Sequence, residues 1–152
     1  MGELRDEGCD RIVLVPEDFE VPRGLVTERF RLEPLGPKHN ESDYAAWTSS
    51  IEHIRKTPGL VGWGWPPDQM PLEQNLADLE EHAQDFEERK GFTYTVLDPD
   101  RDEVIGCVYI YPSAVRSWVR ADRAELDKPL YEAVSGWLAD WPLTKQLNYA
   151  PR

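Results

Sequence analysis

The sequence is poor in cysteine and histidine, and it has no long hydrophobic run. Its two cysteines, Cys9 and Cys107, are too few for a disulfide framework. The three histidines lie far apart and have no second His or Cys at ligand spacing, which argues against a metal site. No window approaches the ~18 consecutive apolar residues of a membrane span, and residues 1–10 are charged and lack the apolar stretch of a signal peptide. We therefore expect a cytoplasmic protein that holds no metal and does not associate with a membrane.

Positive charge is also scarce, with 17 Lys and Arg against 29 Asp and Glu and a net charge of −12. This balance excludes a general binder of nucleic acid or of anionic membranes, because their phosphates would be repelled. A local basic pocket can still hold one anionic ligand. What the chain does have is a hydrophobic fraction of 40% with 11% aromatic residues, enough for a packed core in the single domain that 152 residues predict.

The clearest structural pattern lies in the C-terminal half. Residues 92–97 alternate large and β-branched side chains, and residues 104–111 form the nearly continuous apolar run of a central strand. A turn rich in Pro and Asp joins them at 98–102. Residues 117–120 predict a third, short strand, and the apolar residues of 129–141 recur at helical spacing. This order predicts an α/β frame, in which the joint between the last strand and the helix commonly holds the ligand.

Outside these elements, the loop between the first two predicted helices, at 60–67, is rich in Gly, Pro and Trp. Its two tryptophans, Trp63 and Trp65, form either a wall or lid that faces a substrate or a plug at the bottom of the core. The other predicted elements are a short edge strand at 12–15, a strand at 27–33, a helix that begins at Asn40, a helix at 72–89 and a final strand at 143–149.

This order of elements, with an aromatic loop between the first two helices, resembles the GNAT superfamily of N-acetyltransferases. The phrases that carry the resemblance are FRLEPL at 30–35, YTVL at 94–97, VIGCVY at 104–109 and WVR at 118–120. It implies a GNAT-like acyltransferase domain over 27–152, with a mixed, mostly antiparallel α/β sheet that is flanked by helices and truncated at its C-terminal end. Residues 1–26 are then an N-terminal extension that is partly extended or disordered.

In that family, two neighbouring parallel strands splay apart around the pantetheine arm of acetyl-CoA. The loop after the fourth strand binds the pyrophosphate through backbone N–H groups in a Gln/Arg-x-x-Gly-x-Gly/Ala pattern, because glycines let the backbone approach the phosphates and the helix start offers free donors. The resemblance thus implies acetyl-CoA as cosubstrate. It also implies a cofactor site formed by Trp118, Val119, Arg120, Arg123, Leu126, Asp127 and Lys128.

The sequence departs from the family pattern at the glycines. With Arg123 aligned to the leading Gln or Arg, Leu126 and Lys128 stand where the glycines are expected. Pro129 removes one N–H from the first helical turn, and Asp127 is expected as the N-cap, which places a carboxylate beside the phosphate position. The cations of this joint either bind phosphate through their side chains or balance neighbouring acids on a solvated turn.

The end of the chain departs from the family as well. The family's thiolate-protonating Tyr belongs to a helix that this sequence lacks. Tyr109, Tyr111 and Tyr149 are the candidates for that role, and nothing in the sequence selects one of them. A sheet that stops early leaves an exposed edge, so we expect a homodimer, and six Trp residues agree with an interface.

Two functions remain open. The first is an acyl-CoA-dependent N-acetyltransferase that acts on a small amine. The second is a non-catalytic GNAT-like module that has lost acetyl-CoA binding and binds a small ligand or a protein. The joint at 120–128 discriminates between them: free backbone N–H groups in an open cleft favour the enzyme, and donors that are capped in a filled cleft favour the module.

Overall fold

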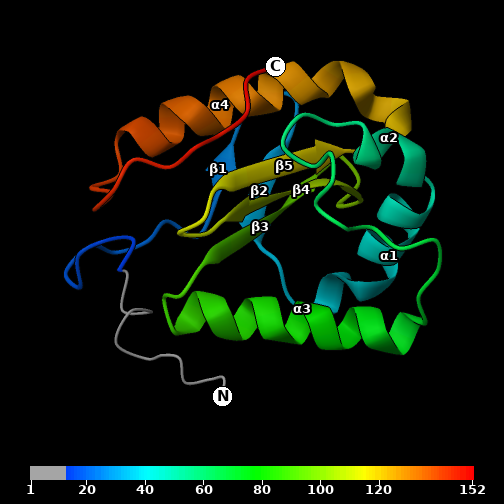
Figure 1. Cartoon of the computed structure of the whole chain (residues 1–152), viewed down its shortest axis with the longest axis horizontal. Coiled ribbons are helices and arrows are strands. Elements are labelled where there is room, and N and C mark those ends of the chain that lie inside the picture. Colours follow the sequence, from blue (N-terminus) through cyan, green and yellow to red (C-terminus); the bar gives the residue numbers. More distant parts are fainter. Residues whose placement is uncertain (1–12) are drawn as a thin grey trace.

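The structure is a computed structural model and describes residues 13–152. The predictions for Cys9 and for residues 1–12 lie outside this range. Five strands form one sheet in the order β1-β2-β3-β4-β5, and every neighbouring pair is antiparallel (Figure 1). The strands are β1 Leu25–Val26, β2 Arg31–Pro34, β3 Phe92–Leu97, β4 Val104–Ile110 and β5 Val115–Val119. The helices are η2 Pro37–His39, α1 Asn40–Thr48, α2 Ile51–Arg55, α3 Leu72–Glu87, η3 Ala121–Leu126 and α4 Asp127–Ala139.

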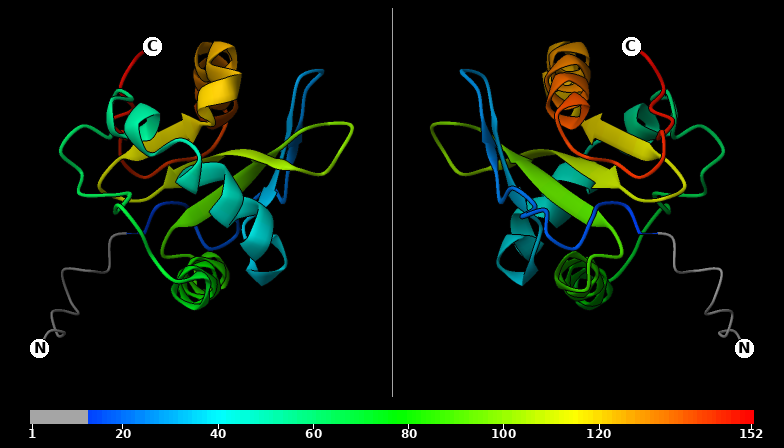
Figure 2. Two further views of the ribbon diagram at one scale, coloured as in Figure 1. Left: turned by 90° about the vertical axis from the view of Figure 1, so that its right-hand side faces the viewer. Right: turned by 90° about the vertical axis from the view of Figure 1, so that its left-hand side faces the viewer.

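The sheet lies between two helical layers. Helix α4 covers one face, and α1 and α3 cover the other (Figure 2). Side chains alternate between the layers as strand geometry requires. On β3, Tyr94 packs against Trp137 of α4, whereas Thr93 on the opposite face contacts His82 of α3. Both faces of the central strands are therefore buried, which explains the nearly continuous apolar sequence of β4.

Two hydrophobic clusters fill the layers, one on each face of the sheet. The cluster under α4 includes Tyr94, Val108, Val119, Leu130 and Val134. The cluster under α1 and α3 includes Trp47, Leu79, Cys107, Tyr109 and Trp118. Trp47 and Trp118 are completely buried, so at least two of the six tryptophans serve the core.

The predicted fold class is confirmed, since the sheet is antiparallel apart from one isolated parallel bridge between Val115 and Tyr149. Strand β3 has the predicted bounds, and the predicted helices at 72–89 and 129–141 are α3 and α4 with slightly shifted ends. The helix from Asn40 is interrupted, because Ser49 and Ser50 separate α1 from α2.

The short strand predicted at 117–120 is β5, which begins two residues earlier, at Val115, and ends at Val119. Three other predicted strands differ more from the structure. Residues 143–149 contribute only the bridge at Tyr149, and residues 13–15 form a bend instead of a strand, although Leu14 and Val15 are buried. The strand predicted at 27–33 begins later, at Arg31, because Thr27 makes a side-chain turn in which the Phe30 N–H donates to Thr27 Oγ1. The described part of the predicted extension, 13–26, packs on the domain: it includes β1, and its buried residues belong to the cluster under α4.

Within residues 13–152, no helix is both long and apolar enough to cross a membrane.

Candidate functional site

The joint between β5 and α4 uses its backbone N–H groups internally. The N–H of Arg120 donates to the carbonyl oxygen of Ile105 in β4 over 2.9 Å, and that of Ala121 donates to Ser50 Oγ over 2.8 Å. The Arg123 N–H bonds the carbonyl oxygen of Arg120 over 2.9 Å, and the Asp127 N–H bonds that of Ala124. These four donors are therefore already satisfied and are not free to bind an anion.

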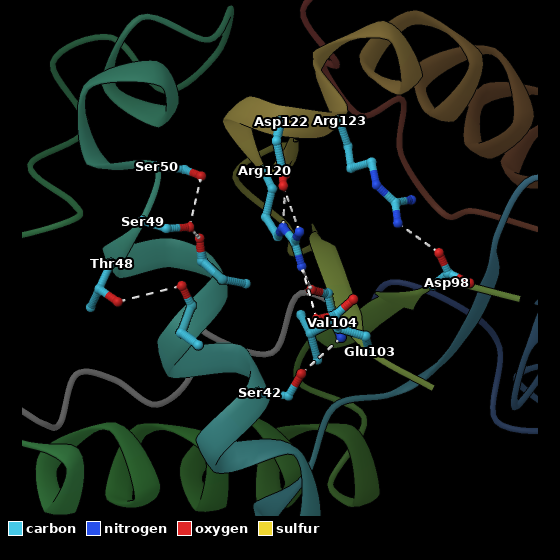
Figure 3. A network of polar contacts seen from close by, with 12 residues as sticks. Ser42, Thr48, Ser49, Ser50, Asp98, Glu103, Val104, Arg120, Asp122 and Arg123 are labelled. Atoms are coloured by element: carbon cyan, nitrogen blue, oxygen red, sulfur yellow. Dashed lines mark hydrogen bonds and ion pairs between the residues drawn. The ribbon is translucent and has the colours of Figure 1, made fainter. Parts of the chain in front are cut away.

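The two arginines of the joint are paired with acidic residues. Figure 3 shows Arg120 turned toward Asp122, at 2.7 Å, and Arg123 turned toward Asp98, also at 2.7 Å. The pairing is strong enough to lower the pKa of both carboxyl groups, mainly through the hydrogen bonds from the arginines. Lys128 is exposed on the surface. Arg120 and Arg123 thus balance acidic side chains, as the second interpretation of these cations predicted.

Asp127 does not cap α4, which corrects the expectation for this residue. It is the first residue of the helix, and Leu126 precedes it at the N-cap without a side-chain cap. Its Oδ2 accepts a hydrogen bond of 2.7 Å from Nε of Arg152, and its buried Oδ1 has no partner among the described residues. The reason is the competing charge: the Arg152 side chain is only 3% exposed and reaches the carboxylate directly.

Arg152 also bridges the last segment of the chain to β5. Its Nη2 donates to the carbonyl oxygen of Ser117 over 2.7 Å, and the Ser117 and Tyr149 hydroxyls lie 2.7 Å apart. One step along the strand, the N–H of Val115 donates to the carbonyl oxygen of Asn148 over 2.8 Å. The space beside β5, where the resemblance implies the pantetheine arm, is therefore crossed by the Arg152 guanidinium and its hydrogen bonds.

Taken together, these residues do not fit acetyl-CoA in the way the resemblance implies. The glycine positions hold Leu126 and Lys128, and Leu126 is buried under α4. The Trp118 side chain packs into the cluster under α1, and Val119 packs into the cluster under α4, so neither side chain faces the joint. A pyrophosphate placed at the joint would meet the Asp127 carboxylate where it needs free N–H donors.

The three candidate tyrosines do not come together. Tyr149 lies beside β5, and burial raises its pKa to about 12. Tyr109 accepts a hydrogen bond from the Trp118 indole, and Tyr111 donates one to Asp85. Burial raises the pKa of both of these hydroxyls well above the usual value. Of the three, only Tyr149 belongs to the segment 143–149, and it forms the bridge with Val115 of β5.

A second site lies on the other face of the sheet, where α1, α3 and the tryptophan loop enclose a pocket of about 360 Å³. We call it the acidic aromatic pocket. Its walls include Asp43, Trp63, Trp65, Asp78, Asp85 and Tyr109. The loop residues Trp63 and Trp65 both line it, with ring centroids 6.2 Å apart, and Trp65 also packs on Trp118 of the core. The wall and the plug interpretations of the loop are thus compatible.

Asp43 is the most deeply buried acid of this pocket, with 4% of the residue exposed. Its Oδ2 accepts a hydrogen bond of 3.2 Å from the Asn75 amide, whose own oxygen accepts from the Trp47 indole over 2.9 Å. Burial raises the pKa of Asp43 to about 6, and the nearby charge of Asp78 acts in the same direction. The Asp43 carboxylate thus receives its hydrogen bond from the neutral Asn75 amide and not from a cation.

His82 and Asp85 form the end of the pocket near β4. The imidazole Nδ1 lies 3.1 Å from the Tyr111 hydroxyl and 3.1 Å from Thr93 Oγ1, and Tyr111 in turn donates to Asp85 over 2.8 Å. Burial lowers the pKa of His82 in spite of the acids around it, so the ring is neutral at pH 7. The pocket therefore carries acidic groups without a histidine cation to balance them.

The acids of this pocket are not among the residues that the sequence pointed to. Asp78, Glu81 and Asp85 of α3 line the pocket. Asp43 lies one residue before Tyr44 and four before Trp47, on the buried side of α1. An acid inside an apolar stripe is the signal that could have identified it.

A larger hollow of about 770 Å³ lies between the C-terminal half of α4 and the segment 143–149. None of its lining residues belongs to the joint at 120–128, and it has no buried charge comparable with Asp43. Within residues 13–152, no group of three or more His, Cys, Asp or Glu side chains is placed to hold a metal ion.

The fold of the chain is similar to that of several solved structures. No family model and no curated protein matches the chain. Among solved structures, it is similar to a ribosomal-protein-S5-alanine acetyltransferase from Vibrio fischeri, with a TM-score of 0.58, 12% identity, and coverage of 79% of this chain and 66% of that one. It is also similar to the microcin C7 self-immunity acetyltransferase MccE, which was solved with acetyl-CoA and AMP, with a TM-score of 0.57, 14% identity, and coverage of 79% and 67%. A GCN5-related N-acetyltransferase from Brucella melitensis gives a TM-score of 0.60 at 13% identity, with coverage of 86% and 60%.

These neighbours are acetyltransferases of the GNAT family, and at such identities the likeness establishes that this chain has the GNAT fold. The chain spans about two thirds of the length of the first two.

Proposed function

We propose that this chain is a GNAT-fold module that binds a small ligand and does not bind acetyl-CoA at the joint between β5 and α4. The observation that carries the proposal is the buried ion pair between Arg152 and Asp127, at 2.7 Å, beside β5. It supports the module because it fills the opening that the cofactor would need. The satisfied N–H groups of the joint support the same conclusion.

Energetics favour the internal arrangement over the cofactor. A pyrophosphate at the joint would have to displace Arg152 from Asp127 and leave a carboxylate that is 21% exposed beside the phosphates. Breaking such a buried pair costs about 3 kcal/mol or more, and repulsion between like charges adds to that. We therefore infer that the chain keeps the GNAT fold, and that its own Arg152 and Asp127 occupy the place where a GNAT enzyme binds acetyl-CoA.

Isothermal titration with acetyl-CoA tests this proposal. We expect no saturable binding to the wild-type chain up to about 1 mM ligand, which is about 100 times a dissociation constant of ~10 μM. Asp127→Gly combined with Lys128→Gly puts a glycine at one of the two expected positions, removes the carboxylate beside the phosphate position and releases Arg152 from its partner. If the joint has the position we assign, this variant gains affinity for acetyl-CoA. Micromolar binding by the wild type would contradict the proposal.

A second candidate is an acyl-CoA-dependent N-acetyltransferase that acts on a small amine. The parallel bridge between Val115 and Tyr149 favours it, because the GNAT cofactor lies between two parallel strands at this place in the fold. Mass spectrometry of a set of small amines incubated with acetyl-CoA and the protein measures this activity directly. An acetylated product above the level of a heat-denatured control would establish the enzyme and exclude the module.

The homodimer stays a prediction, but its original reason is weaker. The outer edge of β5 is paired at Val115 with Asn148 and at Ser117 with Arg152, so this part of the edge is not open to a second chain. At the other end of the sheet, β1 is only two residues long.

A further inference from the structure

The acidic aromatic pocket combines π-faces with negative charge. The centroids of the Trp63 and Tyr109 rings are 5.4 Å apart, and Trp65 lies next to Trp63 in the same wall. The face of an aromatic ring carries the negative part of its quadrupole and attracts a cation that lies over it. The chain already uses this property: the Arg116 guanidinium carbon lies 4.8 Å from the centroid of the Trp63 ring.

The charge of the pocket is not balanced from within. Asp43, Asp78, Glu81 and Asp85 line it, and no Lys or Arg does so in the part of the chain that the structure describes. None of the described ion pairs includes any of these four acids. An acidic lining of this kind repels phosphates and carboxylates, so an anionic ligand is excluded.

Asp43 provides a second and independent observation. A carboxylate that is 4% exposed is expensive to keep in a protein unless a cation compensates it, and its hydrogen bond comes from the neutral Asn75 amide. Asp43 lines the pocket, and none of the described ion pairs includes it. Among residues 13–152, no cation pairs with Asp43, and the wall of the pocket that it lines also includes the rings of Trp63, Trp65 and Tyr109.

We propose that the acidic aromatic pocket binds a small organic cation, a primary or quaternary ammonium compound. The alkyl groups of the ligand pack against the aromatic walls, and its positive charge lies over the rings. The carboxylate of Asp43 is the counter-ion at the bottom of the pocket. A volume of about 360 Å³ is at the lower end for ligand pockets and restricts the ligand to a small molecule. This inference deepens the proposed function, since it gives the chemical class of the ligand.

The test uses matched probes on the full chain. Choline and propylammonium are titrated at constant ionic strength and followed by tryptophan fluorescence, and 3,3-dimethylbutan-1-ol serves as the uncharged isostere of choline. We expect saturable binding of at least one cation, and binding of the alcohol that is weaker by about tenfold or more, because the contact with the rings and the carboxylate requires the charge.

Two variants and one control locate the site. Asp43→Asn and Trp63→Ala should each weaken the binding of the cation by about tenfold or more. Glu80→Gln, which removes the same charge from an exposed position of α3 outside the pocket, leaves the affinity unchanged. Trp63 is 38% exposed, so its replacement spares the core, and an unchanged unfolding midpoint verifies this.

Three results would overturn the inference. The first is that neither cation saturates the protein at about 100 times a millimolar dissociation constant. The others are that the alcohol binds with the same affinity as choline, or that Glu80→Gln and Asp43→Asn lose the same affinity for the cation. None of these results depends on the acetyl-CoA titration. A failed cation site is therefore distinguishable from a failed assignment of the joint.

Discussion

Replacing Asp43 with Asn is expected to stabilise the protein while it weakens the pocket as a cation site. Asn keeps the shape of the side chain and can still accept the hydrogen bond from the Asn75 amide. It removes the charge that burial disfavours. The substitution therefore separates the contribution of the residue to folding from its contribution to binding, which is the trade-off expected at a functional site.

The magnitude follows from the pKa of Asp43, which rises from 3.8 to about 6 on folding. That difference corresponds to about 3 kcal/mol of lost stability when the group is fully ionised. In the variant, the Asn75 amide donates to a neutral amide oxygen instead of a carboxylate, and this weaker hydrogen bond offsets about 1 kcal/mol of the gain in stability. The free energy of unfolding of the variant should thus exceed that of the wild type by about 2 kcal/mol at pH 8. For a domain of this size, this raises the thermal midpoint by roughly 4–8 °C.

The direction of the pH dependence follows from the raised pKa. The folded state holds the Asp43 proton more tightly than the unfolded chain, so this contribution to stability is fully present below pH 3.8 and is lost as the pH rises through about 6. Among the groups that interact with Asp43, Cys107 and Tyr109 have pKa values raised by burial and stay neutral in this range. The advantage of the variant should therefore grow between about pH 4 and pH 7.

Urea denaturation of both proteins at several pH values between 4 and 8 measures this difference. The wild type and the variant share all other titrating groups, so their difference isolates Asp43. Glu80→Gln controls for the general effect of one charge less on an acidic protein. A difference in unfolding free energy that does not change with pH, or a variant that is less stable than the wild type at pH 8, would refute the reasoning.

Four further predictions concern the scaffold and its assembly. Arg152→Ala should lower the free energy of unfolding by about 3 kcal/mol in urea titrations, because it leaves the Asp127 carboxylate beside β5 without its cation; an unchanged midpoint would mean that the pair does not form. Gly106→Ala should destabilise by about 2 kcal/mol or more, since a Cβ there would lie 2.4 Å from the carbonyl oxygen of Trp118. Gly136→Ala, inside α4 with nothing within 4 Å, should instead stabilise by about 0.5–1 kcal/mol, and thermal melts of the two variants should shift in opposite directions. Light scattering should give twice the chain mass if the homodimer exists, and a single-chain mass contradicts it.

The elements of the sheet were predictable because their patterns are local. The alternation in β3 and the apolar run of β4 report burial on one or both faces, and the stripe of α4 reports its contact with the sheet. The final strand at 143–149 was not predictable in this way. Its apolar residues pack beside α4, and only Tyr149 reaches the ladder of β5.

The site was harder to predict because it depends on pairs that are distant in the sequence. Arg152 meets Asp127 across 25 positions, and Asn75 meets Asp43 across 32. No periodicity reveals such contacts. The loss of glycines at Leu126 and Lys128 was visible in the sequence, but the guanidinium that fills the space beside them was not.

The central claim is that the ligand site of this GNAT fold is the acidic aromatic pocket and not the joint between β5 and α4. The most direct measurement is a titration of the ¹⁵N-labelled chain by two-dimensional NMR, first with acetyl-CoA and then with choline. The account predicts that choline shifts the indole signals of Trp63 and Trp65, and that acetyl-CoA leaves the backbone signals of residues 120–128 in place. Saturable shifts of residues 120–128 with acetyl-CoA, and none of the indoles with choline, would contradict it.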